Sequence, residues 1–373
     1  MMLVLRQCLI TLTRGGKALN TCLAKPALNL ERPLQPVKFA RLLIVKTSSM
    51  GDVVHMLPAV TDIRRARPEI QIDWVVDEAF AELPLLHPGI RRVLPAPLRR
   101  WRRQWGRGLG QELLGFIRLL RAEPYDLILD TQGLLKSALI TRLARGLRCG
   151  PDVRSARESP SAWFYDRTYA VARGRHAVDR NRELAALALG LPPAADSLDY
   201  GVTAPPAPAE LGLPADYMVC LHGASRASKL WPLGCWLELV RRLAELGIKV
   251  VLPWSSGQER ERAEAMAAAA PGSQVLPRLA LRPLAGVLAG ARAVVGLDSG
   301  LSHLAVALDQ PTLALYLDTA PALTGLLGKP GRAVNLGGPG GKPMPADVLA
   351  RLAAMGVISP AAVQDPRVKK GMT

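Results

Sequence analysis

The residues best placed for chemistry lie in polar turns that directly follow apolar strands. Asp52 ends the turn Lys46-Thr-Ser-Ser-Met-Gly-Asp52, which follows the apolar run Leu42–Val45. A short run of this kind is typical of a parallel strand that is covered on both faces. Open α/β sheets bind their ligands at the carboxyl ends of the strands, and this carboxylate stands there. The alternative is that Asp52 only caps a helix that begins at Val53.

A second turn of this kind suits an anion. Asp298-Ser-Gly-Leu-Ser-His303 follows the expected strand 293–296 and opens an apolar helical run. Backbone amides at a helix N-terminus attract negative charge, so this turn suits a diphosphate. Lys229, in a polar loop after the expected strand 217–221, is a candidate to neutralise the same group. The alternatives are an ordinary capped helix and a solvated surface lysine.

A third group of candidates is a cluster of cations. Arg99, Arg100, Arg102 and Arg103 surround Trp101. Guanidinium groups bind carboxylates and phosphates in a planar, bidentate way. The same composition also suits RNA or a membrane surface, so the cluster alone leaves the ligand open.

Elements that alternate between strand and helix must position these turns. The strands expected in the first half of the chain cover 42–45, 72–76, 93–94 and 127–129, and those in the second half cover 217–221, 249–252, 274–276, 293–296 and 312–316. Alternation of this kind predicts parallel sheets with helices on both faces. The extended, proline-rich segment 201–214 is the best linker, so we expect two α/β domains.

Composition narrows the class of protein. The 373 residues include 33 glycines and 31 prolines, which suits many strand–loop–helix units, and the formal net charge of +17 predicts an acidic partner surface. Five cysteines without a C-x-x-C pair argue against a disulfide framework and a structural zinc site, and fit a reducing cytoplasm. No run of 18 apolar residues occurs, so we expect no membrane-spanning helix.

Several enzyme classes are disfavoured because the sequence lacks their motifs. The sequence lacks the motifs of P-loop NTPases, Rossmann dehydrogenases and α/β-hydrolases. The five histidines show neither H-E-x-x-H nor an i,i+4 pair, so we expect no metal site.

Seven further blocks accompany the Asp52 turn in an order that is similar to a known family. They are Arg99-Arg-Trp-Arg-Arg103, Asp130-Thr-Gln-Gly-Leu-Leu-Lys136, Ala156-Arg-Glu158, His176-Ala-Val178, Lys229-Leu-Trp-Pro232, Leu252-Pro-Trp254 and Asp298-Ser-Gly-Leu-Ser-His303. Together with His55, Leu57-Pro-Ala59 and Asp73-Trp-Val-Val76, they resemble the lipopolysaccharide heptosyltransferase I family, which belongs to glycosyltransferase family 9.

The resemblance implies a GT-B fold, in which two Rossmann-like α/β/α domains face each other across a cleft. It implies the domain bounds 38–203 for acceptor binding and 215–345 for donor binding, joined by a linker at 204–214. A basic extension at 1–37, which we expect to be disordered, and a C-terminal helix and tail at 346–373 complete the chain.

The resemblance also implies roles for individual residues. Asp52 matches the position proposed as general base. The residues on the donor side are Ser225, Lys229, Glu259, Asp298, Ser299, Gly300, Leu301 and His303. Those on the acceptor side are Ser49, Met50, Gly51, Arg99, Arg100, Arg102, Arg103, Lys136, Arg157 and Arg180.

The sequence departs from the family in two loops. Ala224 and Ser225 stand where family members often carry two threonines, so one hydroxyl contact is expected to be missing. Leu317-Asp-Thr-Ala-Pro321 replaces the usual Gly-Pro-Thr-Asp-Pro, which leaves the contacts of that turn open.

The implied activity is inverting transfer of the first heptose from ADP-L-glycero-β-D-manno-heptose to Kdo of Kdo2-lipid A. We expect neither a cofactor nor a metal, and a cytoplasmic monomer at the inner face of the inner membrane that binds no nucleic acid. Two alternatives stay open, namely a heptosyltransferase II-like enzyme that adds a later heptose and a non-catalytic, basic nucleic-acid-binding protein.

Overall fold

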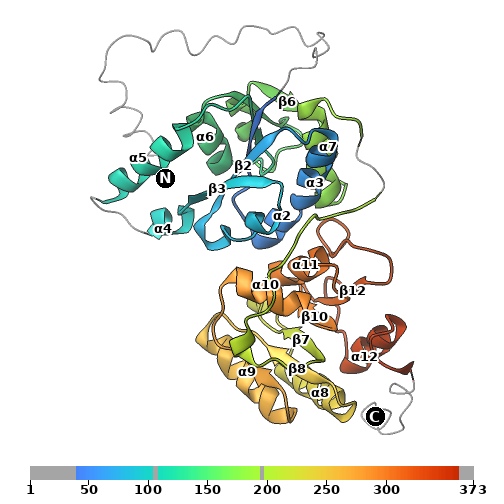
Figure 1. The fold of residues 1–373 in the computed structure, drawn as a ribbon. Helices are drawn as coiled ribbons and strands as arrows, with labels where there is room; N and C mark the ends of the chain where they lie inside the picture. The colour runs from blue at the N-terminus through green and yellow to red at the C-terminus, as the bar shows by residue number, and fades with distance from the viewer. Residues whose placement is uncertain (1–38, 104–107, 194–196, 361–373) are drawn as a thin grey trace, which may run out of the picture.

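Two α/β domains lie one above the other in the computed structural model, which describes residues 39–103, 108–193 and 197–360 (Figure 1). Each domain has a six-stranded sheet between layers of helices. The two-domain α/β architecture predicted from the strand–helix alternation is therefore confirmed. The extension 1–37 and the tail beyond 360 lie outside the described residues.

The N-terminal sheet has the strand order β3-β2-β1-β4-β5-β6, and every pair is parallel. Its strands are β1 (Arg41–Val45), β2 (Gln71–Asp77), β3 (Ile90–Ala96), β4 (Leu127–Asp130), β5 (Leu147–Pro151) and β6 (Arg167–Tyr169). Its helices are α2 (Met50–Val54), α3 (Leu57–Ala66), α4 (Leu98–Arg103), α5 (Gly108–Arg121), α6 (Leu135–Leu143) and α7 (Ala177–Leu189). Short 3-10 turns cover Glu78–Phe80, Pro84–Leu86 and Ser159–Phe164.

The C-terminal sheet repeats this order, since β12-β11-β10-β7-β8-β9 has the same connectivity when its strands are counted from β7. Its strands are β7 (Tyr217–Leu221), β8 (Lys249–Leu252), β9 (Gln274–Val275), β10 (Ala293–Leu297), β11 (Thr312–Tyr316) and β12 (Ala333–Gly337). Its helices are α8 (Leu233–Glu245), α9 (Gly257–Ala269), α10 (Leu281–Ala289), α11 (Gly300–Ala307) and α12 (Pro345–Ala354), with 3-10 turns at Ala209–Leu211 and Ala227–Lys229.

The strand order fixes where ligands bind in each domain. Strand order reverses between β1 and β4 in the first sheet and between β7 and β10 in the second. Doubly wound sheets bind ligands at the carboxyl ends of the strands at such a switch point. The turns that hold Asp52, Lys229 and Asp298 begin at the ends of three of these strands, β1, β7 and β10 respectively.

The central strands are apolar throughout because successive side chains are buried on opposite faces of the sheet. Leu42 and Ile44 of β1 pack in one core cluster, whereas Leu43 and Val45 pack in another cluster on the opposite face. Helices α5 and α6 cover the second face, and α3 and α7 cover the first. A strand buried on both faces must be apolar at every position, which is why these runs are visible in the sequence.

Three strands differ from the expectation. Neither β5 nor β6 was predicted, because Arg148, Gly150 and Pro151 interrupt the apolar run of β5, and β6 is a three-residue edge strand with two exposed residues. Strand β12 lies in the Gly-rich region after Gly325, where no strand pattern is visible. Edge strands need little apolar character, because a single neighbour pairs with them.

The two domains meet through helices α2 and α11, which touch at two glycines. A Cβ atom on Gly300 would lie 2.4 Å from the Cβ atom of Met50, and a Cβ atom on Gly51 would lie 3.0 Å from the ring of His303. Buried apolar side chains continue across this contact from the first domain into the second. The Tyr200 hydroxyl also donates to the Leu327 carbonyl at 2.7 Å. Glycine at these positions therefore sets how closely the domains approach.

Substituting Gly300 with alanine should separate α2 from α11. The added methyl overlaps a backbone-anchored atom, so we expect a loss of about 1–3 kcal/mol in stability and faster hydrogen exchange in both helices. Gly257 is the matched control, since it also begins a helix and a Cβ there meets nothing within 4 Å. Unchanged exchange in α2 of the Gly300→Ala variant would contradict this account.

Candidate active site between the domains

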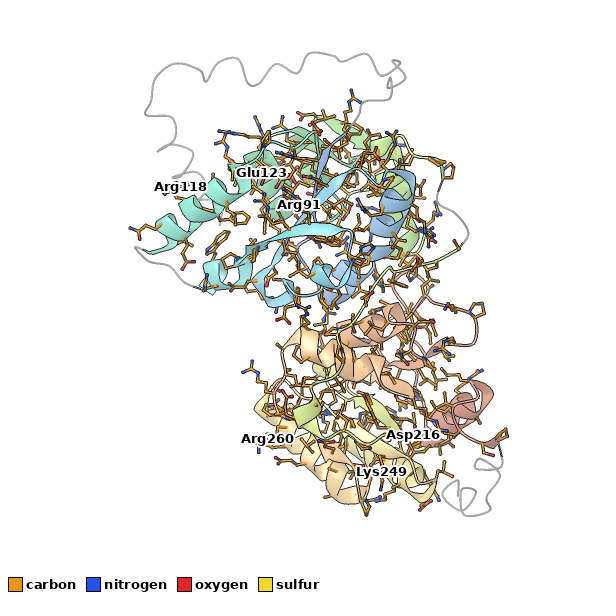
Figure 2. The ribbon with its side chains drawn as sticks, in the orientation of Figure 1. Arg91, Arg118, Glu123, Asp216, Lys249 and Arg260 are labelled. Carbon is orange, nitrogen blue, oxygen red and sulfur yellow. The ribbon has the colours of Figure 1, made fainter. Side chains whose placement is uncertain are left out.

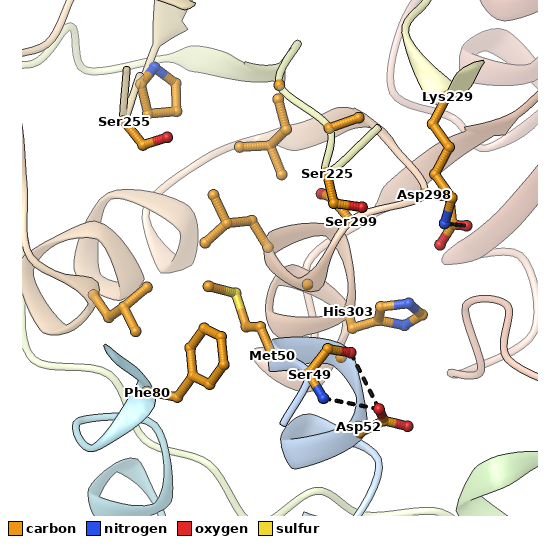
Figure 3. Close-up of a pocket in the computed structure, with 18 of the residues that line it drawn as sticks. Ser49, Met50, Asp52, Phe80, Ser225, Lys229, Ser255, Asp298, Ser299 and His303 are labelled. Carbon is orange, nitrogen blue, oxygen red and sulfur yellow. Dashed lines mark hydrogen bonds and ion pairs between the residues drawn. The ribbon is translucent and has the colours of Figure 1, made fainter. Parts of the chain in front are cut away.

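A cavity of about 630 Å³ lies between the two domains at the carboxyl ends of both sheets. The N-terminal domain contributes Ser49, Met50, Gly51, Asp52, His55, Phe80, Arg99 and Arg157 to its wall, and the C-terminal domain contributes Ser225, Lys229, Trp254, Glu259, Asp298, Ser299, Gly300, Leu301, His303 and Thr319 among others. Figure 3 shows side chains from α2 and α11 lining the same space. Most of the residues predicted to form a site are therefore brought together.

Asp52 is held at the start of α2 by its own helix and by a distant arginine. Its carboxylate accepts hydrogen bonds from the Ser49 amide at 2.8 Å and from the Ser49 hydroxyl at 3.1 Å (Figure 3). The Arg157 guanidinium donates to it at 2.7 Å. The alternative that Asp52 caps a helix from Val53 is wrong in detail, because α2 begins at Met50. Asp52 is the third residue of this helix, and its side chain accepts from the residue that precedes the helix.

Positive charge keeps Asp52 ionised. Burial acts to raise the pKa of its carboxyl, but the charges of Lys46 and Arg157 and the hydrogen bond from Ser49 outweigh burial and hold the pKa at about 2. Lys46 is itself buried, and its ammonium donates to the Thr131 carbonyl at 2.8 Å. Burial lowers the pKa of Lys46 to about 8. At neutral pH, Asp52 is a carboxylate with cations on two sides.

The opposite wall is built around the first turn of α11. Ser299 precedes the helix, and the amides of Gly300 and Leu301 lie in its first turn, where helical amides have no intrahelical acceptor. Lys229 forms an ion pair with Asp298 at 2.5 Å, and the Thr319 hydroxyl donates to the same carboxylate at 2.6 Å. This wall combines helix-terminal amides with a cation, which suits a phosphate group.

Three histidines connect the two walls. The Nε2 atom of His55 lies 3.2 Å from Nδ1 of His303, and the ring of His176 packs edge-on against His55. Burial lowers the pKa of His303 to about 4 and that of His55 well below its usual value. Both rings are therefore neutral at pH 7, and a neutral pair can share one hydrogen bond without charge repulsion.

The remaining predicted residues are distributed around the cavity. Glu259 accepts from the amide and hydroxyl of Ser255, both at 2.7 Å, so it shapes the turn after β8. Arg99 lies over the ring of Phe80 at the cavity edge. Arg100 does not line the cavity but pairs with Glu78 and Glu112. The side chains of Arg102 and Arg103 lie outside the described part of the structure.

Two further predicted cations lie close to the Asp52 turn in the N-terminal domain. Lys136 donates to the Ser48 hydroxyl at 2.9 Å, in the turn before Asp52. Arg180 donates to the Ser155 carbonyl at 3.1 Å and lines a small hollow with Lys46, Asp52 and Arg157. Cations from α6, α7 and the loop after β5, together with Lys46, thus converge on the turn that holds Asp52.

Comparison with known proteins decides the family. The model for "Glycosyltransferase family 9 (heptosyltransferase)" matches residues 113–342. Lipopolysaccharide heptosyltransferase 1 of Pseudomonas aeruginosa is 50% identical over 292 residues, which cover 78% of this chain and 82% of that protein. The structure of the E. coli heptosyltransferase WaaC with ADP aligns with a TM-score of 0.78 at 42% identity and covers 84% of this chain and 99% of that one.

This chain belongs to glycosyltransferase family 9. It is a heptosyltransferase, and the predicted GT-B fold and enzyme class are confirmed. By contrast, lipopolysaccharide heptosyltransferase 2 of Salmonella typhimurium is 34% identical over 118 residues, which span 29% of this chain.

The structure adds residues to this heptosyltransferase site that the sequence did not single out. Lys46 directly follows β1 and is the first residue of the Asp52 turn, and Asn181 bonds both to its ammonium at 3.4 Å and to the His55 carbonyl at 2.9 Å. A lysine directly after an apolar strand was the available signal for Lys46. The pairing of His55 with His303 joins residues 248 positions apart, so no local pattern announces it.

No group of three or more His, Cys, Asp or Glu side chains within residues 39–103, 108–193 and 197–360 is arranged to hold a metal ion. Over the same ranges, none of the helices combines the length and apolar character that crossing a bilayer requires. Metal independence stays a prediction.

Replacing His303 with glutamine should reduce the loss of folding stability that occurs as the pH falls. The pKa of His303 is lowered in the folded state, so the unfolded chain binds more protons between about pH 6.5 and 4, and stability falls as the pH falls through this window. At about pH 5 this histidine alone costs on the order of 2 kcal/mol.

Glutamine keeps a hydrogen-bonding group toward His55 but does not titrate. The measurement is the melting temperature of wild type and His303→Gln at about pH 7.5 and pH 5, with the variant expected to lose less on acidification. Equal losses in the two proteins would show that His303 does not carry this proton linkage.

Proposed function

We propose that this heptosyltransferase adds the first L-glycero-D-manno-heptose from the ADP-heptose donor to Kdo of Kdo2-lipid A, with inversion at the anomeric carbon. One observation carries the proposal. Asp52, a carboxylate that is ionised at neutral pH, shares one cavity with Lys229 and the N-terminal amides of α11, which together suit a phosphate group. An inverting transfer needs a base and a leaving-group site on opposite sides of the reacting carbon.

The donor would bind with its diphosphate at the first turn of α11. Lys229 and the amides of Gly300 and Leu301 would bind the phosphate oxygens, and Glu259 would hold the ribose. Lys229 is paired with Asp298 in the free protein, so the donor diphosphate would compete for its ammonium. As the anomeric C–O bond breaks, negative charge grows on the departing ADP, and fixed donors stabilise that charge more strongly than water does.

The acceptor side would supply the attacking oxygen. A Kdo hydroxyl oxygen forms the new bond to the anomeric carbon from the face opposite ADP, and its proton passes to a carboxylate oxygen of Asp52. The bond to the β-phosphate oxygen breaks with its electron pair leaving on ADP. Every proton and electron pair is thus accounted for by the two substrates and Asp52, and no cofactor or metal enters the step.

The positive charges of Lys46 and Arg157 make Asp52 a weak base in the free protein, because a carboxyl with a pKa of about 2 holds a proton poorly. Kdo carries a carboxylate, and lipid A carries phosphates. These anions would attract Arg157 and Arg180 away from Asp52, and the loss of nearby positive charge raises a carboxyl pKa. Acceptor binding would therefore strengthen the base at the moment when it is needed.

The choice of the first heptose over a later one is supported by the extent of similarity. In sequence, the likeness to heptosyltransferase 1 is 50% identity over 78% of the chain, whereas that to heptosyltransferase 2 is 34% identity over 29%. We further propose a cytoplasmic, monomeric enzyme that works at the inner face of the inner membrane, where its lipid acceptor would be presented. Arg99 at the cavity edge supports recognition of an acidic acceptor.

The function is tested by measuring ADP release from purified protein given ADP-heptose, with and without delipidated Kdo-lipid A, in buffer with EDTA. We expect release that depends on the acceptor and is not reduced by EDTA. Donor-induced thermal stabilisation without release would support the nucleotide site and overturn the acceptor, in favour of a later-heptose enzyme. Tight, salt-sensitive nucleic-acid binding with no response to ADP-heptose would support the rival binding protein instead.

Replacing Asp52 with alanine should remove turnover but leave donor binding intact. The base is lost, whereas Lys229 and the α11 wall are untouched, so we expect a decrease in kcat of about 100-fold or more with the thermal shift by ADP-heptose retained. Asp199→Ala is the control, since Asp199 is also paired with an arginine but lies outside the cavity. An Asp52→Ala variant that keeps more than roughly a tenth of wild-type activity would remove Asp52 as the base.

A further inference from the structure

The outer layer of the N-terminal domain combines exposed leucines with arginines. Helices α5 and α6 and the turn Ser159–Phe164 lie side by side on one face of the first sheet. Their inner sides pack on the sheet through Phe116, Leu120 and Ile140. Their outer sides expose Leu114 at 45%, Leu119 at 40% and Trp163 at 69%. We call this surface the α5–α6 face.

The charge of the α5–α6 face is positive. The exposed charged residues of α5 and α6 are three arginines, Arg118, Arg121 and Arg142, and one acid, Glu112. Glu112 is engaged by Arg100 and by the indole of Trp101. Figure 2 shows Arg118 on α5 at the outside of the domain. Asp166, beside the turn that carries Trp163, is paired with Arg148.

We propose that the α5–α6 face docks this protein on an anionic lipid surface. Exposed leucines and a tryptophan among arginines enter the headgroup region of a bilayer, where apolar groups leave water and cations meet anionic lipid. RNA would use the arginines but gain little from isolated leucines, since bases stack on aromatic rings and phosphates bind cations. The mixture of side chains therefore favours lipid over nucleic acid.

The position of the face fits a membrane-bound acceptor, and in this respect the inference rests on the proposed function. The first turn of α6 lies at the reaction site, because Lys136 bonds to Ser48 and the Leu135 amide donates to Glu158 at 2.6 Å. Arg157, which directly precedes Glu158, forms the ion pair with Asp52. A lipid headgroup at this end of the face reaches Asp52 while its acyl chains stay in the bilayer.

The test is flotation of the full chain with vesicles of phosphatidylcholine alone and with roughly one-third phosphatidylglycerol. We expect wild type to bind the anionic vesicles, and the double variant Leu114→Ser/Leu119→Ser to bind them roughly tenfold more weakly. Leu233→Ser/Leu246→Ser is the matched control, since these leucines are exposed at 40% and 39% in the other domain. This control should bind as wild type does.

A second pair of variants separates charge from apolar contact. Arg118→Gln/Arg121→Gln should weaken binding to the anionic vesicles and reduce its dependence on salt. The inference is overturned if wild type does not bind anionic vesicles or if the leucine variant binds them as well as the control does. It is also overturned if single-stranded RNA competes vesicle-bound wild type off this face.

Activity on a water-soluble acceptor keeps this inference distinct from the proposed function. The leucine variant should release ADP from ADP-heptose with delipidated Kdo-lipid A as fast as wild type, which also shows that it is folded. If wild type binds vesicles but releases no ADP with this acceptor, the proposed function fails and the docking face stands. If wild type releases ADP but all variants bind vesicles equally, only the docking face fails.

Discussion

The active-site geometry depends on the direct contact between helices α2 and α11. Gly51 and Gly300 let the two helices approach until α2, which carries Asp52, touches α11, whose first turn forms the opposite wall of the cavity. Each helix begins at the switch point of its own sheet, so the contact brings two separate binding edges into one cavity. The neutral pair of His55 and His303 closes the same contact without placing a charge in it. Hydrogen bonds from Tyr200 to the Leu327 carbonyl and from the Ala177 amide to the Leu323 carbonyl also join the two domains.

The repeated strand order gives each domain one ligand edge, but the chemistry at the two edges differs. The first edge gathers Lys46, Arg157 and Arg180 around a carboxylate, whereas the second places a lysine and helix-terminal amides beside Asp298. A carboxylate can accept a proton, and hydrogen-bond donors can stabilise a leaving diphosphate. The same backbone frame thus holds a carboxylate on one side and a lysine with helix-terminal amides on the other, which is the arrangement that the proposed inverting transfer requires.

Local patterns predicted the parts of the site that are encoded within a few residues. Asp52, Lys229 and Asp298 were found because polar turns after apolar strands mark the ligand edge of a parallel sheet. The pairing of Asp52 with Arg157 spans 105 positions, and its geometry depends on β5, a strand that Arg148 and Pro151 hide from pattern analysis. Arg100 was grouped with Arg99 by spacing, yet only Arg99 reaches the cavity. Long-range ion pairs follow from topology, so a single sequence carries no direct signal for them.

If Asp52 is the base, as proposed, its ion pair with Arg157 gives the enzyme a way to favour the acceptor over water. A water molecule in the open cavity brings no negative charge, so it leaves Arg157 on Asp52 and meets a carboxylate whose pKa is about 2. A sugar acid brings a carboxylate that competes for the same guanidinium, and each unit by which the pKa of Asp52 then rises corresponds to about 1.4 kcal/mol of added proton affinity. In the proposed mechanism the acceptor would therefore activate the base that it needs, whereas hydrolysis of the donor would meet a weak base. On this argument the arginines near Asp52 act in selectivity as well as in binding.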